Sequence, residues 1–294
     1  MTKTPTLSIS IVTYRSDVGA FRKALLALHR ALAVASEAYP LSTTLFIVDN
    51  SCDPAWSNCL EATMLQAFPE TATARAEFIK STSNSGYGRG NNIAIEKARS
   101  DYHLVLNPDV YLESDALRGA ISYMEHNHQV GLLSPAVYGS DGRRHHICKR
   151  DPDLLVMTLR GFCPSRLRSF FQRRLDLFEM RDRDYAQIIT DVQYPTGCFM
   201  FFRTRDLKRI GGFDPRFFLH FEDADAGRRL RQIAAIHYLP SVQVVHDWAG
   251  GVRQSWRRRW LAAKSGIIYF SKWNGALGAS ESVAMPRPEL REKR

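Results

Sequence analysis

Cysteine is scarce in this chain, and its spacing does not suggest a disulfide framework. The 294 residues include 5 cysteines, an odd number, and no two of them are spaced as Cys-x-x-Cys. The apolar run at residues 7–12 is broken by two serines and preceded by a single lysine, so no secretory signal is visible. We therefore expect free thiols in a reducing cytoplasm.

Long hydrophobic runs are missing as well. No apolar stretch approaches the roughly 20 residues that a membrane-spanning helix needs. Nevertheless 45% of the residues are hydrophobic, which is enough to bury a large core. The length suits one elaborated α/β domain or one domain with a tail. The sequence therefore predicts a chain that does not span a membrane.

Two common nucleotide-binding motifs are absent. A glycine-rich stretch lies at residues 84–92, but no Gly-Lys-Ser or Gly-Lys-Thr follows it, which excludes a P-loop. The dinucleotide fingerprint belongs after the first strand of its fold, where this chain has Thr-Tyr-Arg at residues 13–15. A nicotinamide-dependent enzyme is therefore disfavoured.

Acidic residues are outnumbered by basic ones, and the excess is concentrated. The net charge is +10, and the two strongly basic segments are residues 143–183 and 253–272. Both segments also carry Phe, Trp or Leu, a mixture that favours an anionic membrane surface as a partner. A nucleic acid bound through residues 256–260 is the disfavoured alternative.

The first half of the chain alternates short apolar runs with helical patterns. The apolar runs, each of which predicts a strand, lie at residues 8–13, 44–49, 77–80 and 103–106. Apolar residues recur at helical spacing over 21–32, and Asp53 followed by Pro54 is typical of a helix start. The alternation predicts an α/β fold of Rossmann-like type, with a mostly parallel central sheet flanked by helices.

Beyond residue 130 the pattern is less regular. Further strands are predicted at residues 131–138, 193–203, 237–239 and 242–246. Residues 150–190 are basic, aromatic and irregular in period, and we interpret them as an insertion on the membrane side. One domain is therefore expected over residues 1–250, with a basic aromatic C-terminal extension at 251–294 that ends in a frayed tail.

Polar residues follow each of the first four predicted strands. They lie at residues 13–15 (Thr-Tyr-Arg), 49–51 (Asp-Asn-Ser), 84–92 and 107–109 (Asn-Pro-Asp). In an open parallel sheet, ligands bind beyond the carboxyl ends of the strands. Each segment alone could be an ordinary turn, but four at one edge predict a shared ligand site.

Two of these segments suggest a bound phosphate and its metal. Asp109 offers the carboxylate that a hard divalent cation needs, and the alternative is a simple turn. Gly86 would let the backbone approach an anion, and a helix that begins near Asn91 would direct its N–H groups at phosphate. The alternative for this stretch is a flexible loop.

An acidic cluster lies among aromatic residues at 221–225 (Phe-Glu-Asp-Ala-Asp). Carboxylates in apolar surroundings have a raised pKa and can act as bases. The alternative is helix capping, which suits Asp225 best. His246 ends the last predicted strand and could ligate a metal or contact phosphate, although a single histidine is more often structural.

Together these features resemble the family 2 glycosyltransferases of GT-A fold, in particular bacterial rhamnosyltransferases of polysaccharide and O-antigen assembly. The resemblance covers about residues 7–250 and rests on the ordered motifs Val48-Asp49-Asn50-Ser51, Asn84-Ser85-Gly86-Tyr87-Gly88, Leu106-Asn107-Pro108-Asp109, Thr196-Gly197-Cys198-Phe199-Met200, Gly212-Phe213-Asp214, Phe221-Glu222-Asp223 and Val245-His246. The motifs are specific for the family and much less specific for the sugar.

On the nucleotide side, the resemblance implies a binding role for several residues. Asp49 would read the edge of the base, and Thr13 and Arg15 would line the nucleotide pocket. Asn84 and the loop that follows it, with Gly86 and Asn91, would lie beside the ribose and the diphosphate.

On the reaction side, the resemblance implies that Asp223 is the general base and that Glu222 binds substrate next to it. Gly197 would lie under the donor sugar. Asp109 and His246 would bind Mg²⁺ or Mn²⁺. Asn107, also placed at the substrate, stands where the family has the first Asp of its Asp-x-Asp motif, so the metal site has one carboxylate fewer.

The activity implied is a single displacement that inverts the anomeric carbon. The donor would be dTDP-L-rhamnose, with a UDP-sugar as the alternative. The acceptor would be a polyprenyl-diphosphate-linked saccharide or a polysaccharide, reached by an enzyme held peripherally on the inner face of the plasma membrane. A nucleotide-sugar-binding protein without turnover is the alternative from a different functional class.

Overall fold

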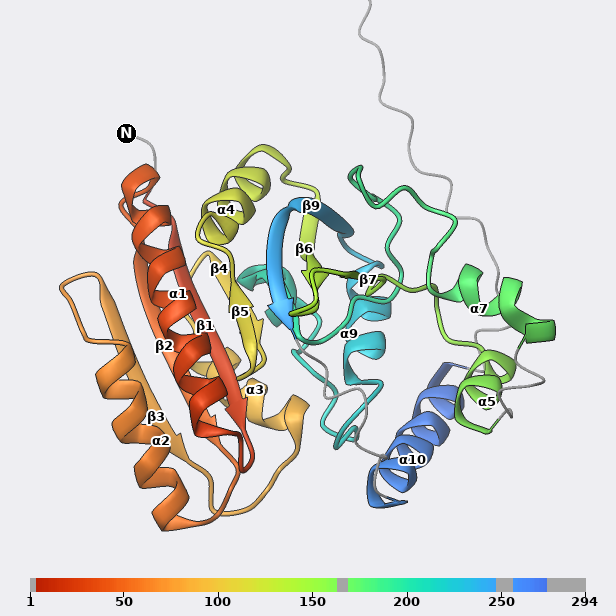
Figure 1. Ribbon diagram of the computed structural model, residues 1–294, viewed down its shortest axis with the longest axis horizontal. Helices are drawn as coiled ribbons and strands as arrows, with labels where there is room; N and C mark the ends of the chain where they lie inside the picture. Colours follow the sequence, from red (N-terminus) through yellow and green to blue (C-terminus); the bar gives the residue numbers. More distant parts are fainter. Residues whose placement is uncertain (1–3, 163–168, 247–255, 274–294) are drawn as a thin grey trace, which may run out of the picture.

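The computed structural model describes residues 4–162, 169–246 and 256–273 (Figure 1). The strands are β1 (Thr6–Thr13), β2 (Ser42–Asp49), β3 (Ala74–Lys80), β4 (Tyr102–Leu106), β5 (Val110–Leu112), β6 (Val130–Tyr138), β7 (Arg144–His145), β8 (Phe199–Arg203) and β9 (Ala235–His246). The helices are α1 (Val18–Ala38), α2 (Pro54–Ala67), α3 (Tyr87–Lys97), α4 (Ala116–His126), α5 (Leu154–Phe162), the 3₁₀ turn η1 (Ser169–Phe171), α7 (Gln172–Phe178), α8 (Thr204–Arg209), α9 (Glu222–Leu230) and α10 (Trp256–Trp273).

All the strands belong to one sheet, as the α/β prediction required. The order is β3-β2-β1-β4-β8-β6-β9-β5, and β7 pairs with β6 at the side. The strands β1 to β4 are parallel, whereas β8 runs antiparallel to both β4 and β6. This mixed, mostly parallel sheet flanked by helices has the α/β architecture that the sequence predicts.

The first two helices begin at capping residues and bury an apolar face. The side chain of Asp17 accepts a hydrogen bond from the Ala20 N–H and caps α1, whose apolar residues are buried over 21–32. Asp53 caps α2 in the same way, with Pro54 as the first helical residue. Helix α1 lies between α2 and α4 and packs against both. The predicted start of α2 and the buried stripe of α1 are therefore confirmed.

Three details differ from the sequence-based expectations. Helix α3 begins at Tyr87, four residues before the expected start near Asn91. Strand β8 begins at Phe199, and in the segment before it Tyr194 makes an isolated bridge with Lys149. The two short runs expected around Pro240 form one continuous strand, β9, because a register irregularity opposite Pro135 accommodates the proline.

The segment left unassigned at residues 150–190 contains α5, η1 and α7. These helices bury their own small core of Val156, Leu159, Leu175 and Phe178, separate from the main core around the sheet. In Figure 1 they lie at the end of the molecule that also carries α10. The frayed tail that the sequence predicts falls within residues 274–294, which lie outside the described residues.

Candidate active site

The carboxyl ends of β1 and β2 form a closed polar floor. Thr13 lies opposite Asp49 in the strand register, and neither side chain is exposed. The Asp49 carboxylate accepts hydrogen bonds from the hydroxyls of Thr13 (2.9 Å), Ser51 (2.5 Å) and Ser57 (2.5 Å). The predicted contact between the nucleobase of the donor and the Asp49 carboxylate therefore requires one of these hydroxyls to move first.

The rim above this floor is exposed and has an unusual backbone. Arg15 and Cys52 both adopt left-handed φ angles, 48° and 54°, which are uncommon for residues with a side chain. The Arg15 N–H donates to the Ser51 hydroxyl at 2.9 Å, which ties the two loops together. Arg15, Tyr14 and Cys52 are exposed, so their side chains are the accessible groups at this edge.

The glycine-rich stretch is shaped by a close approach of two backbones. Gly86 has φ of 86°, and a Cβ at this position would lie 2.2 Å from the Phe218 carbonyl oxygen. The Asn84 side chain accepts from the Gly86 N–H at 3.0 Å, and the Asn50 amide donates to the Gly86 carbonyl at 3.0 Å. Only glycine fits here, and Asn84 holds the turn that leads into α3.

Asn91 does not reach this edge, contrary to the sequence-based expectation. The helix begins at Tyr87, so Asn91 falls in its second turn and is fully buried. Its amide accepts from the Ser10 hydroxyl at 2.7 Å and donates to the Tyr87 carbonyl at 3.0 Å. Asn91 therefore fastens α3 to β1, and its contact with the donor stays a prediction.

The predicted metal ligands lie side by side, although they are far apart in the sequence. Strand β5 pairs with β9 so that Val110 lies opposite His246, which brings the preceding Asp109 to the histidine. The His246 Nε2 and a carboxylate oxygen of Asp109 are 3.4 Å apart. Burial acts to lower the pKa of His246, but the hydrogen bond with Asp109 and contacts with Cys198 outweigh it and raise the pKa to about 9.

The donor set fits a divalent cation that shares its ligands with a substrate. No cluster of three or more His, Cys, Asp or Glu side chains exists among the described residues. A carboxylate and an imidazole supply two ligands, and Asp109 remains partly exposed toward solvent. Mg²⁺ and Mn²⁺ commonly complete such a set with water and phosphate oxygens. Asn107, partly exposed before Asp109, has its N–H bonded to the Cys198 carbonyl at 2.9 Å.

Asp223 lies in the first turn of α9 and is held by backbone N–H groups. One carboxylate oxygen accepts from the Gly197 N–H at 3.0 Å, and the other accepts from the Ala224 N–H at 2.9 Å. The Tyr87 hydroxyl donates to the Gly197 carbonyl at 2.7 Å and so fixes the same peptide segment from α3. Gly197 therefore links the glycine-rich stretch to the carboxylate of Asp223.

Glu222 lies beside Asp223 and is 5% exposed. Its Oε2 atom is buried and has no hydrogen-bond partner among the described residues. Burial, together with the negative charge of Asp223, raises the pKa of Glu222 well above its usual range. Two adjacent carboxyl groups thus differ in character, since Asp223 is solvated by N–H groups and Glu222 favours its protonated form.

Lys149 and Tyr194 complete this side of the site, and sequence reasoning missed both. Their backbones pair, and the Lys149 ammonium lies 4.7 Å from the centre of the Tyr194 ring. Burial lowers the pKa of Lys149, and the nearby Asp223 charge opposes that effect. Lys149 stands in a basic run that resembles a solvated surface segment, so no sequence signal distinguished it.

Comparison with known proteins agrees with this geometry. The model of the family described as Glycosyl transferase family 2 matches residues 8–211. The rhamnosyltransferase WbbL of Escherichia coli (strain K12) is 27% identical over 174 residues, which are 55% of this chain and 60% of that protein. An N-acetylglucosaminyl-diphospho-decaprenol L-rhamnosyltransferase of Mycobacterium tuberculosis is 26% identical over 196 residues, 62% of each chain. The chain thus spans about 60% of the length of these curated relatives.

Solved structures with the same fold are more distant in sequence. The mannosyltransferase PcManGT from Pyrobaculum calidifontis, in complex with GDP-Man and Mn²⁺, superposes with a TM-score of 0.60 at 16% identity, over 93% of this chain and 65% of that one. GalNAc-T7 with UDP, GalNAc and Mn²⁺ gives a TM-score of 0.57 at 12% identity, over 84% of this chain and 45% of that one. At these identities the likeness establishes the GT-A fold alone.

Proposed function

Because the chain belongs to glycosyl transferase family 2, we propose that it is an inverting glycosyltransferase that moves L-rhamnose from dTDP-L-rhamnose to a hydroxyl of a lipid-linked saccharide. One observation carries the proposal. The Asp223 carboxylate accepts from the Gly197 N–H, and the next residue, Cys198, contacts His246 of the Asp109–His246 pair, so both groups border residues 197–198. The names of the two curated relatives support rhamnose as the sugar and a polyprenyl diphosphate as the acceptor anchor.

The chemistry assigned to Asp223 is proton removal. Its oxygens accept from the Gly197 and Ala224 N–H groups, which keeps the carboxylate oriented. An acceptor hydroxyl placed against it loses its proton as its oxygen attacks the anomeric carbon from the face opposite the diphosphate. The configuration at that carbon is therefore inverted.

Asp109 and His246 would hold the divalent cation, either Mg²⁺ or Mn²⁺. When bound, the cation supplies positive charge that stabilises the departing diphosphate. The Mn²⁺ named with PcManGT and GalNAc-T7, which share this fold, supports the use of a divalent metal. Asn84 and Gly86 would position the diphosphate beside it, and Arg15 would border the nucleotide.

A transfer assay tests the proposal directly. The purified protein is given dTDP-L-rhamnose or a UDP-sugar, Mg²⁺ or Mn²⁺, and a polyprenyl-diphosphate saccharide, and the glycolipid product is measured by mass spectrometry. We expect product with dTDP-L-rhamnose and little with the UDP-sugars. Product only with a UDP-sugar would change the donor assignment, and donor binding without product would favour a non-catalytic binding protein.

The free thiols offer an independent measurement of where the nucleotide binds. Cys52 is exposed on the rim beside Arg15, whereas Cys59 is exposed in the second turn of α2. A nucleotide diphosphate with Mg²⁺ should slow the alkylation of Cys52 and leave Cys59 unaffected. Equal alkylation of Cys52 with and without nucleotide would place the nucleotide elsewhere.

An anionic membrane surface is the further partner in this proposal. None of the helices in the described part of the chain has the length and apolar character to cross a membrane. Helix α10 nevertheless exposes Trp256 (81%), Trp260 (57%) and Ile267 (71%), which recur at helical spacing on one face. Lys264 lies over the Trp260 ring at 5.6 Å on the same face. Such a mixture suits the boundary between headgroups and acyl chains.

The neighbouring insertion extends this exposed apolar surface. Leu154 on α5 is 64% exposed and Phe170 in η1 is 81% exposed. Tyr194 packs both against the small core of α5 and α7 and against the cluster that contains α10. Juxtamembrane cations contribute about 1 kcal/mol each at an anionic surface. The side chains of Arg257 and Arg258, which the sequence also assigned to this surface, lie outside the described part.

Flotation with liposomes measures this association. The protein should rise with vesicles of phosphatidylglycerol and phosphatidylcholine at low salt and be released at high salt. A variant with Trp256→Ala and Trp260→Ala should bind less, whereas Leu65→Ala, which removes an exposed apolar side chain from α2, should not. Indifference of the unmodified protein to anionic vesicles at low salt would favour a soluble acceptor.

A further inference from the structure

The turn that leads into Asp223 has a strained backbone. His220 and Phe221 adopt left-handed φ angles of 69° and 66° in succession, directly before Glu222 and Asp223. Residues with a side chain rarely adopt this conformation, and it persists where surrounding contacts enforce it. Helix α10 supplies several of the contacts on this turn.

Helix α10 holds this turn through its inner face. The Ser265 hydroxyl donates to the Leu219 carbonyl at 2.8 Å. The Phe221 ring packs against Tyr269, with 5.3 Å between ring centres, and against Phe270 at 6.2 Å. Tyr269 is fully buried, so this side of α10 belongs to the interior of the protein. The opposite side of the same helix carries the exposed tryptophans.

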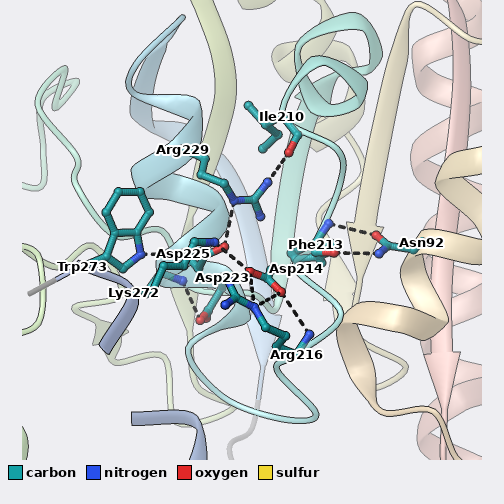
Figure 2. Close-up of polar contacts among 11 residues, drawn as sticks. Asn92, Ile210, Phe213, Asp214, Arg216, Asp223, Asp225, Arg229, Lys272 and Trp273 are labelled. Atoms are coloured by element: carbon teal, nitrogen blue, oxygen red, sulfur yellow. Dashed lines mark hydrogen bonds and ion pairs between the residues drawn. The ribbon is translucent and has the colours of Figure 1, made fainter. Parts of the chain in front are cut away.

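Charged groups fasten the end of α10 to α9, as Figure 2 shows. The Asp225 carboxylate is fully buried and contacts three groups: the Arg229 guanidinium at 2.8 Å, the Lys272 ammonium at 2.7 Å and the Trp273 indole N–H at 3.0 Å. The Arg228 guanidinium lies over the Trp273 ring at 4.5 Å. Lys272 and Trp273, at the end of α10, therefore bind the first turns of α9.

Lys272 also reaches a second carboxylate on a different segment. Its ammonium lies 2.8 Å from Asp214, in the loop between α8 and α9. Hydrogen bonds from Arg216, followed by those from Lys272, hold the pKa of Asp214 well below its usual range. One ammonium therefore joins two carboxylates from two segments, and a shift of α10 by one turn would break both contacts.

We propose that α10 is a clamp on the base-bearing turn, with Lys272 as a positioning residue for Asp223; this rests on the proposed role of Asp223 as the base. Lys272 does not touch the reacting atoms. It fixes Asp225, and Asp225 belongs to the same first turns of α9 as Asp223. A buried charge pair adds little net stability over apolar packing, but removal of one partner leaves the other charge uncompensated, so the pair disfavours arrangements in which the two segments separate. That is the property a positioning device needs.

Two lysine substitutions test the clamp. Lys272→Met removes the ammonium that joins Asp214 and Asp225, and Lys23→Met, the control, removes an exposed ammonium from α1. We expect kcat for transfer to fall about 10- to 100-fold in Lys272→Met, since small misplacements of catalytic groups cost on this order. Donor affinity, measured by calorimetry, should stay within about twofold, because the contacts of α10 described above are with residues 214–228. Lys23→Met should keep its kcat.

Amide hydrogen exchange measures the clamp without relying on activity. Peptides that cover residues 219–226 should exchange faster in Lys272→Met, while those covering β1 and β2 should not change. If the unmodified protein transfers no sugar, the proposed function fails, but the exchange result still decides the clamp. Unchanged exchange in these peptides, or transfer within twofold of the unmodified protein, would overturn it.

Two further variants separate positioning from general destabilisation. Lys272→Arg keeps the charge and should recover part of the transfer rate. Trp273→Phe removes only the indole bond to Asp225 and should have a smaller effect than Lys272→Met. Equal losses of donor affinity and of transfer rate in Lys272→Met, without recovery in Lys272→Arg, would mean that Lys272 merely supports folding.

Discussion

The two sides of the site are held together by different kinds of interaction. On the proposed nucleotide side, hydroxyl groups and a backbone N–H surround one carboxylate, Asp49, at the ends of adjacent parallel strands. On the side of Asp223, the proposed base, charged groups and a left-handed turn are held by a helix from the end of the described chain. The first side is part of the sheet itself, whereas the second is assembled on the sheet by packing.

The sequence separations of the contacts reflect this difference. Thr13 and Asp49 are 36 residues apart, as are Asn50 and Gly86, which are typical distances for a strand and its crossover helix. Tyr87 contacts Gly197 across 110 residues, and Asp214 contacts Lys272 across 58. The nucleotide side is thus a product of local folding, and the side of the base depends on tertiary contacts.

The largest effect that separates the two sides should come from Asp223→Asn. The amide keeps the shape but cannot accept a proton, so transfer should fall by about 10²- to 10⁴-fold. Nucleotide binding, measured by calorimetry, should change little, because that contact lies on the other side. Turnover close to normal would instead move the base to Glu222 or Asp225.

Asp109→Ala addresses the boundary between the two sides. Asp109 is the only carboxylate in residues 107–109, and the remaining His246 alone is a weak metal ligand. Mg²⁺ should lower the Kd of a nucleotide diphosphate in both proteins, and we expect the factor to be at least tenfold smaller in the variant than in the unmodified protein. If the metal tightens binding equally in both, Asp109 is a turn residue.

Ser57→Ala should weaken the nucleotide side through its buried carboxylate. The substitution removes one of the hydroxyls that bond Asp49, and an unsatisfied buried group costs about 1–3 kcal/mol of unfolding free energy. Urea denaturation measures the loss. Ser36→Ala, on an exposed position of α1, is the matched control and should be neutral. Equal stability of the two variants would mean that Asp49 is not a structural centre.

Glu222→Gln should give the smallest effect, and it should be stabilising. Since folding raises the pKa of Glu222, the unmodified protein loses stability as pH rises from the unfolded-state pKa of about 4.3 through the folded-state pKa. The glutamine has no proton to lose, so the variant should melt higher at neutral pH and match the unmodified protein near pH 4. Glu37→Gln, exposed on α1, should show no such pH dependence. A difference in melting temperature between Glu222→Gln and the unmodified protein that does not vary with pH would contradict the raised pKa of Glu222.

Sequence reasoning succeeded where a signal was local. The apolar runs predicted β1, β2, β3 and β4, and the polar residues after them marked the edge where Thr13, Asp49 and Asp109 lie. Asp53 and Pro54 identified the start of α2, because capping depends on neighbouring residues alone.

Sequence reasoning failed where remote segments decide the structure. The start of α3 depends on the Phe218 carbonyl, which accepts from the Tyr87 N–H, and nothing near residue 87 announces that contact. The start of this helix was consequently predicted four residues too late, near Asn91. Lys149 belongs to the site only because its backbone pairs with Tyr194. The roles of Asp225 and Lys272 likewise required the packing of α10 on α9.

The pairing of β5 with β9 has a consequence for the order in which this protein matures. Asp109 is translated early, but it gains His246 only when β9 joins the sheet. Chains fold from the N-terminus during synthesis, and long-range strand pairing is slow. A nascent chain of half length contains every residue of the polar floor around Asp49 but lacks His246. The proposed metal site can therefore be completed only after nearly the whole sheet has been synthesised.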